Sequence, residues 1–555
     1  MAVRRRPVYL GGMTIDGLLT VLALFAAIYA VLTPIQRLRL TLSWRPQVLV
    51  ALPAFALILA LELGSVRPPA CPADPAAWCR WLILADADPG PAKKLAFIVA
   101  LIWLAAAVAI NRSHRPGLGS VPSIARMAIA LVDEERYAEA LELVEPDMPL
   151  LTRAGRRQTR RQRLHEWLEE FGPTANNPLA RFSRAPGQRF AGKDWPEWAA
   201  RPVRGLAKVT PSHARAEHAA SDLLQLLRGS ARLLDYIVER RPYFGLRLIE
   251  EQSLGAMEFC ETYLGRLIAS PGSALYQELA TNDVGDGQVG YRLPARNRLL
   301  HFLFSDAVVA ERLSAWQGVG DHVQRLLDGD LGRQYASWLN APARRFDEDR
   351  YRDPTFMGMF FFDVMVTSAA KQGVEYHMWL LYLPHFAEAL EKVYDSTGPE
   401  VDRDAEFPVR AARLLYELVQ TLKGWVGLFD RLPEDSPHRR PPGAREHPST
   451  IPHAAAVALG HTLATVIASE RIDESVVDTI YELAVRKVRD LHGNEAAGFR
   501  AYLVDALLRG GYGTERTGHL ERLAGLFPRM DYMLQHEVDD YRAALEERLG
   551  RPING

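Results

Sequence analysis

Six arginines within residues 153–163 form the densest group of side chains in this chain that could bind a ligand. They are Arg153, Arg156, Arg157, Arg160, Arg161 and Arg163. Like charges this close repel one another, so the group, called here the basic collar, predicts an anionic partner nearby. Lipid headgroups fit first, at about 1 kcal/mol per basic residue near the surface, and the acidic remainder of the chain fits next. Nucleic acid fits least, because aromatic side chains do not alternate with the arginines.

Familiar catalytic motifs are absent from the sequence. The pair Gly192-Lys193 lacks both the upstream glycine and the following hydroxyl of a phosphate-binding loop. His165 and His536 each precede a glutamate, but neither has the second histidine that a zinc-binding helix places one turn later. No Gly-x-Ser-x-Gly hydrolase motif occurs either. We therefore predict no metal and no cofactor, and we favour a binding protein over an enzyme.

A weaker candidate site lies beside an apolar stripe near residue 300. Asn297, Arg298, His301 and Asp306 carry the polar groups there and could line a pocket. The alternative is an ordinary solvated helix face, because exposed polar residues usually have no further role.

Histidine spacing does not add a metal site. His377 and His385 are eight residues apart, and so are His453 and His461. On a helix this spacing separates two side chains by two turns, about 12 Å along the axis, which is too far to share one ion. We expect structural or surface roles for these histidines.

Three long apolar runs occupy the first fifth of the chain. They are Gly17–Gln36, Pro46–Leu61 and Leu95–Asn111. A helix of about 20 apolar residues crosses a hydrocarbon core, and about 17 still suffice. The first run is long enough, and the two shorter runs need help from flanking residues, so the sequence predicts three transmembrane helices within residues 1–111. Buried core helices are the main alternative, but such helices normally keep one polar face, and these runs have none. A cleaved signal peptide fits poorly because two more runs follow the first.

The loop between the second and third runs carries Cys71 and Cys79, two of the three cysteines in the chain. An oxidising compartment would allow a disulfide between them, and two unpaired thiols are the equal alternative. Basic residues flank the three runs almost evenly, so the positive-inside rule does not decide the orientation. We use the cysteine pair to place this loop outside a bacterial inner membrane and the C-terminal body in the cytoplasm.

Charge separates the rest of the chain into unlike parts. Residues 153–215 hold 14 basic and 5 acidic residues, a net charge of +9, whereas residues 216–555 hold 38 and 50, a net charge of −12. Only 8 of the 66 basic residues are lysine, a bias typical of GC-rich bacterial genes. We predict four parts: a membrane domain (1–111), a linker and helical hairpin with the basic helix (112–170), an irregular basic segment (171–212) and an all-α body (213–555).

Helical periodicity without strand-like alternation predicts a mainly α fold, with an array or bundle of about a dozen helices in the body. One long helix is expected from Ser212 to Arg241, and Asp473 is expected to cap another. The aromatic run at residues 356–364 could dip into a membrane, but the carboxylate of Asp363 within it favours core packing.

A helical hairpin is predicted just after the membrane domain, from apolar helices at residues 124–132 and 137–144. The stretch ERYAEALELV at residues 135–144 resembles the second half of a tetratricopeptide hairpin, in which small alanines let two helices approach closely. No 34-residue repeat follows it, so an ordinary helical hairpin is the favoured interpretation.

These features favour a membrane-anchored helical scaffold or sensor that binds protein partners, with anionic lipid and self-association as further partners. A membrane-perturbing effector of a bacterial cell-death or phage-defence system is an alternative of a different class. An enzyme without a recognisable motif ranks third.

Overall fold

The computed structural model of the chain is mainly helical, as the periodicity predicts. Helices make up 79% of the structure, and the described residues contain no strand. The chain divides into two compact units, Met1–Leu227 and Arg228–Gly555. The structure describes residues 33–62, 91–113, 116–156, 214–250, 255–282, 289–329, 333–343, 348–374, 380, 382–440, 450–491, 496–512 and 518–553.

The first unit contains a long pair of helices followed by shorter ones. The helices among its described residues are α2 (Pro34–Leu42), α3 (Trp44–Glu62), α5 (Pro91–Ser113), η1 (Leu118–Ser120), α6 (Val121–Asp133), α7 (Tyr137–Val144), η2 (Glu145–Asp147), α8 (Met148–Arg156) and most of α11 (Ala214–Gly229). The helices α6 and α7 pack together as the predicted hairpin. Ala125, Ala128 and Ala140 are buried in it, and such small side chains let the two helices approach closely.

The second unit is an array of many more, and shorter, helices than the dozen expected. Its first half contains α12 (Ala231–Arg240), α13 (Pro242–Glu250), α14 (Ala256–Ala269), α15 (Ala274–Ala280), α16 (Arg298–Phe304), α17 (Ala307–Arg312), α18 (Ala315–Leu327), α19 (Arg333–Leu339), η5 (Glu348–Arg352) and α20 (Pro354–Gln372). Its second half contains α21 (Tyr382–Val393), α22 (Arg410–Val426), α23 (Leu428–Arg431), η7 (Pro437–Arg439), α24 (Ile451–Ala468), α25 (Glu474–Asp490), α26 (Ala497–Arg509), α27 (His519–Leu526), η8 (Phe527–Arg529), α28 (Tyr532–Glu537) and α29 (Asp539–Leu549).

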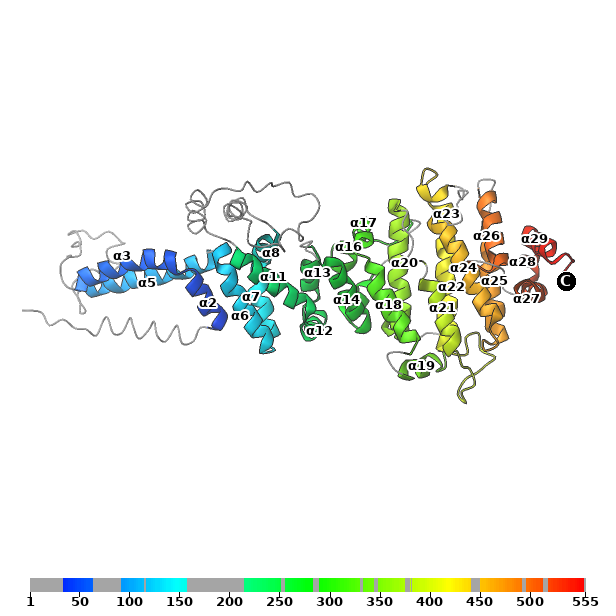
Figure 1. Ribbon diagram of the computed structural model, residues 1–555, viewed down its shortest axis with the longest axis horizontal. Helices are drawn as coiled ribbons and strands as arrows, with labels where there is room; N and C mark the ends of the chain where they lie inside the picture. Colours follow the sequence, from blue (N-terminus) through cyan, green and yellow to red (C-terminus); the bar gives the residue numbers. More distant parts are fainter. Residues whose placement is uncertain are drawn as a thin grey trace, which may run out of the picture. The chain divides into compact units, whose positions relative to one another are not determined.

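Helices of the second unit pack mainly on helices that lie a few elements away along the chain. The helix α14 packs on α18, α18 on α20 and α21, and α21 and α22 on α24, which in turn packs on α25 and α26 (Figure 1). The core therefore runs through the middle of the array, with α20 and α24 as its most completely buried long helices. Phe361 and Phe362 of α20 have no exposed surface, which confirms core packing for residues 356–364.

One local prediction was wrong, and another was confirmed only in part. The long helix expected up to Arg241 is broken, because α11 ends at Gly229 and Ser230 caps α12 by accepting a hydrogen bond from Leu233 N. Asp473 does stand at the N-cap position of α25, but its carboxylate does not cap that helix. It accepts hydrogen bonds from the hydroxyl of Tyr394 and from Arg403 instead, because these side chains reach it from the segment between α21 and α22.

Three transmembrane helices are not supported by the described residues. Within them, one unbroken helix is long and apolar enough to cross a membrane, α24, and 89% of it is buried inside the protein. The second predicted run lies in α3 and passes the same test only together with α2, across a bend, while the third lies in α5 with an apolar stretch that is too short. The first run lies almost wholly outside the described residues.

Candidate functional site

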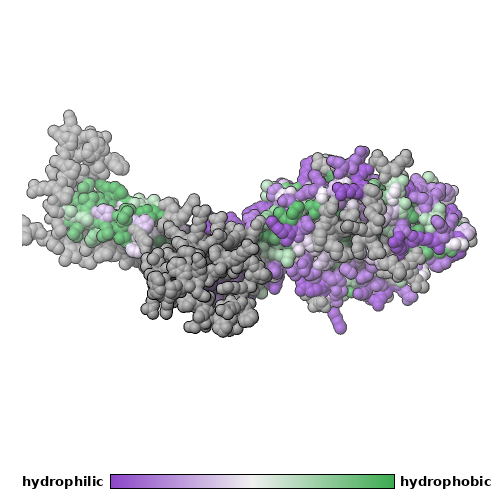
Figure 2. Space-filling model, turned by 45° about the horizontal axis from the view of Figure 1, so that its top comes forward, coloured by the Kyte–Doolittle hydropathy of each residue, from purple (hydrophilic) through white to green (hydrophobic). Residues whose placement is uncertain are grey.

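An apolar helical hairpin of the first unit leaves many of its large side chains exposed. The helices α3 and α5 lie side by side (Figure 1), yet only Leu61 and Ala96 among their described side chains are buried. Leu49 is 76% exposed, and Phe97 and Ile102 are each 64% exposed. Figure 2 shows this hydrophobic surface in green. The hairpin therefore carries apolar side chains around its circumference and not along one core-facing stripe.

A hydrogen-bonded bend fixes one end of the hairpin. The helices α2 and α3 meet at 78°. Ser43 is buried at the junction, where its hydroxyl accepts a hydrogen bond from Gln47 Nε2 at 2.6 Å and its carbonyl accepts one from Gln47 N at 3.2 Å. Trp44 follows the bend and is 55% exposed. An exposed indole at the end of an apolar helix is typical of a membrane–water interface.

The basic collar and the cysteine pair lie mostly outside the described residues. Arg153 is exposed on α8, and Arg156 is the last residue of that helix. The other arginines, within residues 157–163, are not described, and neither are Cys71 and Cys79. Anion binding by the collar and the disulfide therefore stay predictions.

Two of the four residues predicted near position 300 come together around a buried carboxylate. Asn297 Nδ2 donates to the Glu278 carbonyl at 3.2 Å, and the Arg298 guanidinium lies 4.4 Å from the ring centroid of Tyr243. The Glu278 carboxylate accepts the backbone N–H groups of residues 299–300 at 2.9 to 3.1 Å. Burial raises the pKa of Glu278, and these hydrogen bonds oppose the shift. The arrangement satisfies the first turn of α16 and thus has a structural role.

The other two residues of that set have local partners. His301 Nδ1 lies 2.9 Å from the Leu293 carbonyl oxygen. Asp306 caps α17, because its carboxylate accepts a hydrogen bond from Val308 N at 3.1 Å. The structure brings the first two residues together and engages the other two separately, so a pocket shared by all four stays a prediction.

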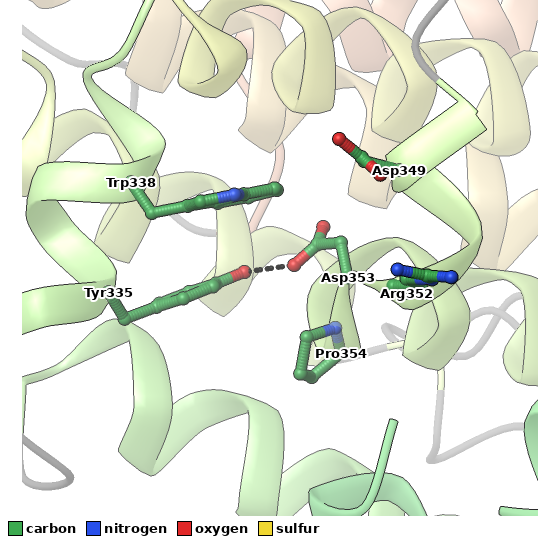
Figure 3. A pocket seen from close by; sticks show the side chains of 6 residues that line it. All are labelled: Tyr335, Trp338, Asp349, Arg352, Asp353 and Pro354. Atoms are coloured by element: carbon green, nitrogen blue, oxygen red, sulfur yellow. Dashed lines mark hydrogen bonds between the residues drawn. The ribbon is translucent and has the colours of Figure 1, made fainter. Parts of the chain in front are cut away.

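A pocket of about 260 Å³ lies where α19 and η5 meet the start of α20. Its lining residues are Tyr335, Trp338, Asp349, Arg352, Asp353 and Pro354. Tyr335 and Trp338 stack with ring centroids 5.5 Å apart and ring planes at 10°. Figure 3 shows both rings reaching towards Asp353, with Asp349 and Arg352 on the opposite side. The pocket therefore combines rigid aromatic walls with a rim that carries both charges.

The floor of the pocket is the N-cap of α20. The Asp353 carboxylate accepts hydrogen bonds from the backbone N–H of Thr355 at 3.3 Å and of Phe356 at 2.9 Å. The Tyr335 hydroxyl also donates to Asp353 and lies 2.6 Å from the Thr355 hydroxyl. Burial raises the pKa of Asp353 to about 6, although these hydrogen bonds oppose the shift. Asp353 therefore holds the helix start and the Tyr335 ring in place.

This pocket was missed by the sequence interpretation, although two of its signals are readable. Tyr335 and Trp338 are three residues apart, which places them on one face of a helix. Asp353-Pro354 has the Asp at N-cap and Pro at the first helical position, a frequent helix start. No sequence signal announces Arg410, whose guanidinium lies 4.4 Å from the Trp338 ring centroid although 72 residues separate the two in the chain.

Other polar groups in the array hold its helices together. Asp363 of α20 accepts hydrogen bonds from the Tyr291 hydroxyl and, at 2.7 Å, from Trp425 Nε1 of α22. Burial raises the pKa of Asp363, and these two donors oppose the shift. The carboxylate therefore ties three separate segments of the chain to one point of the core.

Two histidines from different pairs of the sequence meet at one carboxylate. His461 of α24 lies with Nε2 2.8 Å from Glu388 Oε1, and His385 lies with Nδ1 3.6 Å from Glu388 Oε2. Spacing within one helix could not show this, because the contact joins α21 to α24. Within the described part of the chain, no group of three or more His, Cys, Asp or Glu residues is arranged to hold a metal ion.

Comparison with known proteins does not assign a family to these features. No family model, no curated protein and no solved structure matches the chain. Function must therefore be argued from the apolar hairpin of the first unit and the pocket of the second.

Proposed function

We propose that this chain is a membrane-anchored helical scaffold, whose α3–α5 hairpin inserts into a bilayer and whose second unit binds protein partners. The exposure of the hairpin carries the proposal. Among the described residues, 17 large apolar side chains are exposed, and 11 of them lie between Trp44 and Val108. Water is a poor solvent for such a surface, which costs about 25 cal/mol per Å² to leave uncovered.

The dimensions of the hairpin suit a bilayer. With a rise of about 1.5 Å per residue, the apolar stretches 46–61 and 95–110 each span roughly 24 Å, and the full helices α3 and α5, with 19 and 23 residues, span roughly 28 Å and 34 Å, so the polar ends of the helices must reach into the headgroups. The hydrocarbon core of a bilayer is about 30 Å thick. The sequence also places Lys93, Lys94 and Arg112 near the two ends of α5, where long cationic side chains can reach the headgroups.

The second unit supplies the binding part of the proposed scaffold. Stacked helical arrays present long surfaces on which other proteins dock. We place the anchor in a bacterial inner membrane and the second unit on the cytoplasmic side. The loop that contains Cys71 and Cys79 would then lie in the oxidising compartment.

Vesicle flotation tests the anchor with matched variants. In the hairpin variant, Leu49, Leu52, Phe97 and Ile102 are replaced by serine. In the control variant, four exposed apolar residues of the second unit, Met257, Val308, Tyr532 and Met533, are replaced by serine. Each protein is reconstituted from detergent with neutral lipid vesicles and then centrifuged in a density gradient. The wild-type and control proteins should float with the vesicles.

The apolar run at residues 17–36 could hold the chain to vesicles by itself, so the comparison is repeated with chains that start at residue 33. In that background the hairpin variant should stay at the bottom of the gradient. Flotation of the hairpin variant equal to that of the wild type would contradict the proposal. Release of a trapped dye from the vesicles by the wild-type protein would favour the membrane-perturbing effector over the scaffold.

A further inference from the structure

We propose that the short helix α2 lies flat on the bilayer surface and that the arginines around its bend to α3 bind the headgroups of anionic phospholipids. The inference rests on the proposed membrane anchor, because it names the lipid surface that one end of the hairpin contacts. Three arginines mark this end in the sequence, Arg37, Arg39 and Arg45. Residues 17–61 contain no other basic residue and no acidic one, so this segment has a net charge of +3.

The helix α2 is a separate short helix with its own start and end. It begins with a capping box, in which Gln36 N donates to the Thr33 hydroxyl at 3.4 Å and Thr33 N donates to Gln36 Oε1 at 3.2 Å. It ends at the bend, where the Ser43 hydroxyl donates to the Leu40 carbonyl oxygen at 3.3 Å. Its 9 residues span roughly 14 Å, about half of the hydrocarbon core of a bilayer. The helix is therefore too short to cross a membrane by itself.

The angle at the bend sets the direction of α2. A membrane-spanning helix is tilted on average by about 20° from the bilayer normal, and α2 meets α3 at 78°. If α3 crosses the bilayer, α2 therefore runs close to the membrane plane. The exposed Trp44 stands at the junction, and indole rings of membrane proteins gather at the level of the headgroups. The headgroup region is thus the expected depth of α2.

The residue pattern of α2 suits this depth. Ile35, Leu38 and Leu42 share one face of the helix. Ile35 is buried by protein, whereas Leu38 and Leu42 are only half-buried and can contact lipid. The positions of Arg37 and Arg39 fall on either side of that face. A helix in the interface turns its apolar face towards the acyl chains, while arginines at its edges reach the phosphates.

The two ends of the hairpin differ in charge. Because α3 and α5 run in opposite directions, Arg112 near the end of α5 returns to the end where α2 lies (Figure 1). It joins the three arginines around the bend there. At the opposite end, Glu62 accompanies Lys93 and Lys94. Arginines therefore gather at one end, where the anionic headgroups of a cytoplasmic leaflet would neutralise them.

Spin-label measurements on the full chain test the position of α2. The cysteines within residues 63–90 are replaced by serine, and Cys260 has no exposed surface that a label could reach. Single cysteines then replace Leu38, Leu40 or Leu42 in turn, and each nitroxide is measured in vesicles that contain anionic lipid. Relaxation of the nitroxide by oxygen reports contact with lipid, and relaxation by a neutral nickel chelate reports contact with water.

A helix in the membrane plane gives an order of depths that differs from the order in the sequence. Leu38 and Leu42 lie on the apolar face, and Leu40 lies on the opposite face. The label at Leu40 should therefore be at least about threefold more accessible to the chelate than either of the others. A spanning helix would instead place Leu40 between the other two in depth, because each residue adds about 1.5 Å. That order, or high chelate access at all three positions, would overturn the proposal.

Paired variants test the charge of the lipid. Chelate access at the Leu38 label should fall at least about twofold when anionic vesicles replace neutral ones, and the difference should vanish in about 1 M salt. Replacing Arg37 and Arg39 by glutamine should remove this difference. Replacing Lys93 and Lys94 by glutamine changes as many charges at the other end of the hairpin and should preserve it. Equal access in both kinds of vesicle, or equal loss in both variants, would overturn anionic lipid as the partner.

Vesicle flotation of the same preparations separates this result from the anchor itself. The apolar hairpin should hold the protein to neutral and anionic vesicles alike, because apolar burial does not depend on lipid charge. Flotation with all three labels in water would remove the contact of α2 with lipid and leave the anchor. Loss of flotation would remove the anchor, and with it the basis of the proposal for α2.

Discussion

Two regions of this molecule, the helix α24 and the hairpin of α3 and α5, are both strongly apolar, but protein buries the first and leaves the second exposed. The helix α24 has a mean hydropathy of 1.4 and is 89% buried, packed against α21, α22, α25 and α26. The hairpin leaves most of its large apolar side chains exposed. Apolar composition therefore says that a helix will avoid water, but it does not say whether protein or lipid will cover it.

Residue size distinguishes the two regions better than hydropathy does. In α24, small residues let neighbouring backbones come close: a Cβ on Gly460 would lie 2.2 Å from the Ala506 carbonyl oxygen of α26. The same helix carries His453, whose Nδ1 contacts the Thr450 hydroxyl, and Thr465, whose hydroxyl donates to the His461 carbonyl oxygen. The hairpin instead presents Leu, Phe and Ile side chains outward, a pattern that suits contact with acyl chains and not with a closely packed helix.

The largest expected effect on stability comes from placing a carboxylate in each of the two apolar regions. Leu459→Asp would bury an unpaired carboxylate in α24, where Leu459 has no exposed surface. It should lower the free energy of unfolding by about 4 kcal/mol or more. Leu52→Asp on the hairpin, at a residue that is 64% exposed, should leave denaturant unfolding of the second unit unchanged. Unfolding is followed by circular dichroism in detergent.

The flotation assay tests whether the hairpin, and not the core of the second unit, contacts the bilayer. Leu52→Asp, in the chain that starts at residue 33, should reduce vesicle binding, because a carboxylate near the middle of a membrane helix costs about 3 kcal/mol. An unfolding loss from Leu52→Asp as large as that from Leu459→Asp would mean that protein covers the hairpin, and the comparison would fail.

A smaller effect is expected from pH. Burial lowers the pKa of His453 to about 4, whereas a histidine in the unfolded chain titrates near about 6.5. Between these pH values the unfolded chain binds a proton that the folded chain does not, so stability present above about pH 6.5 is lost as the pH falls towards 4. The contribution is up to about 3 kcal/mol. His453→Gln should therefore flatten the rise of unfolding free energy from pH 4 to 6.5.

Asp353 should change the stability with pH in the opposite direction, so a variant of this residue is the control for His453→Gln. Its raised pKa of about 6 means that the folded chain holds a proton that the unfolded chain releases, so stability falls as the pH rises from about 4 to 6. Asp353→Asn should therefore make the rise with pH steeper than in the wild type, while His453→Gln makes it shallower. Slopes that change in the same direction would contradict both assignments. Flotation by the hairpin, which contains no histidine, should not change over this pH range.

A moderate effect is expected from one methyl group. Gly460→Ala would push α24 away from α26 and should cost about 1–3 kcal/mol of unfolding free energy, because the nearest atom belongs to the backbone and cannot move alone. Gly424→Ala on α22 is the matched control, since nothing lies within 4 Å of its added Cβ. It should stabilise the protein by roughly 0.5–1 kcal/mol. A loss of stability in both variants would mean that close backbone contact does not distinguish Gly460.

Much of the fold follows from local sequence, but its long-range contacts do not. Helical periodicity predicts the all-α class and the hairpin of α6 and α7, because those signals lie within single elements. The break at Ser230 was missed because leucines on both sides keep helical spacing through it. The sequence also could not show whether α24 is buried in protein or in a membrane, since a helix of this composition can be covered by neighbouring helices or by lipid.

The candidate sites show the same limit. Trp338 and Arg410 meet across 72 residues, and His461 meets His385 only because Glu388 of α21 faces α24. Spacing along one helix cannot show such contacts. The apolar character of the hairpin, by contrast, could be predicted from composition alone, because two of the three predicted apolar runs lie in α3 and α5.

The smallest expected effect is the loss of an exposed ion pair in the second unit, compared with the effect of salt on vesicle binding by the hairpin. Arg529 forms an ion pair with Glu474 at 2.7 Å and another with Asp478, but all three side chains are partly exposed. Arg529→Ala should therefore lower the unfolding free energy by about 0.5 kcal/mol or less, and the loss should shrink in about 1 M salt, where the Debye length is about 3 Å. Flotation of the chain that starts at residue 33 should not change in the same salt, because apolar burial is not screened. If salt releases that chain from vesicles containing anionic lipid, then the basic collar, and not the hairpin, holds it there.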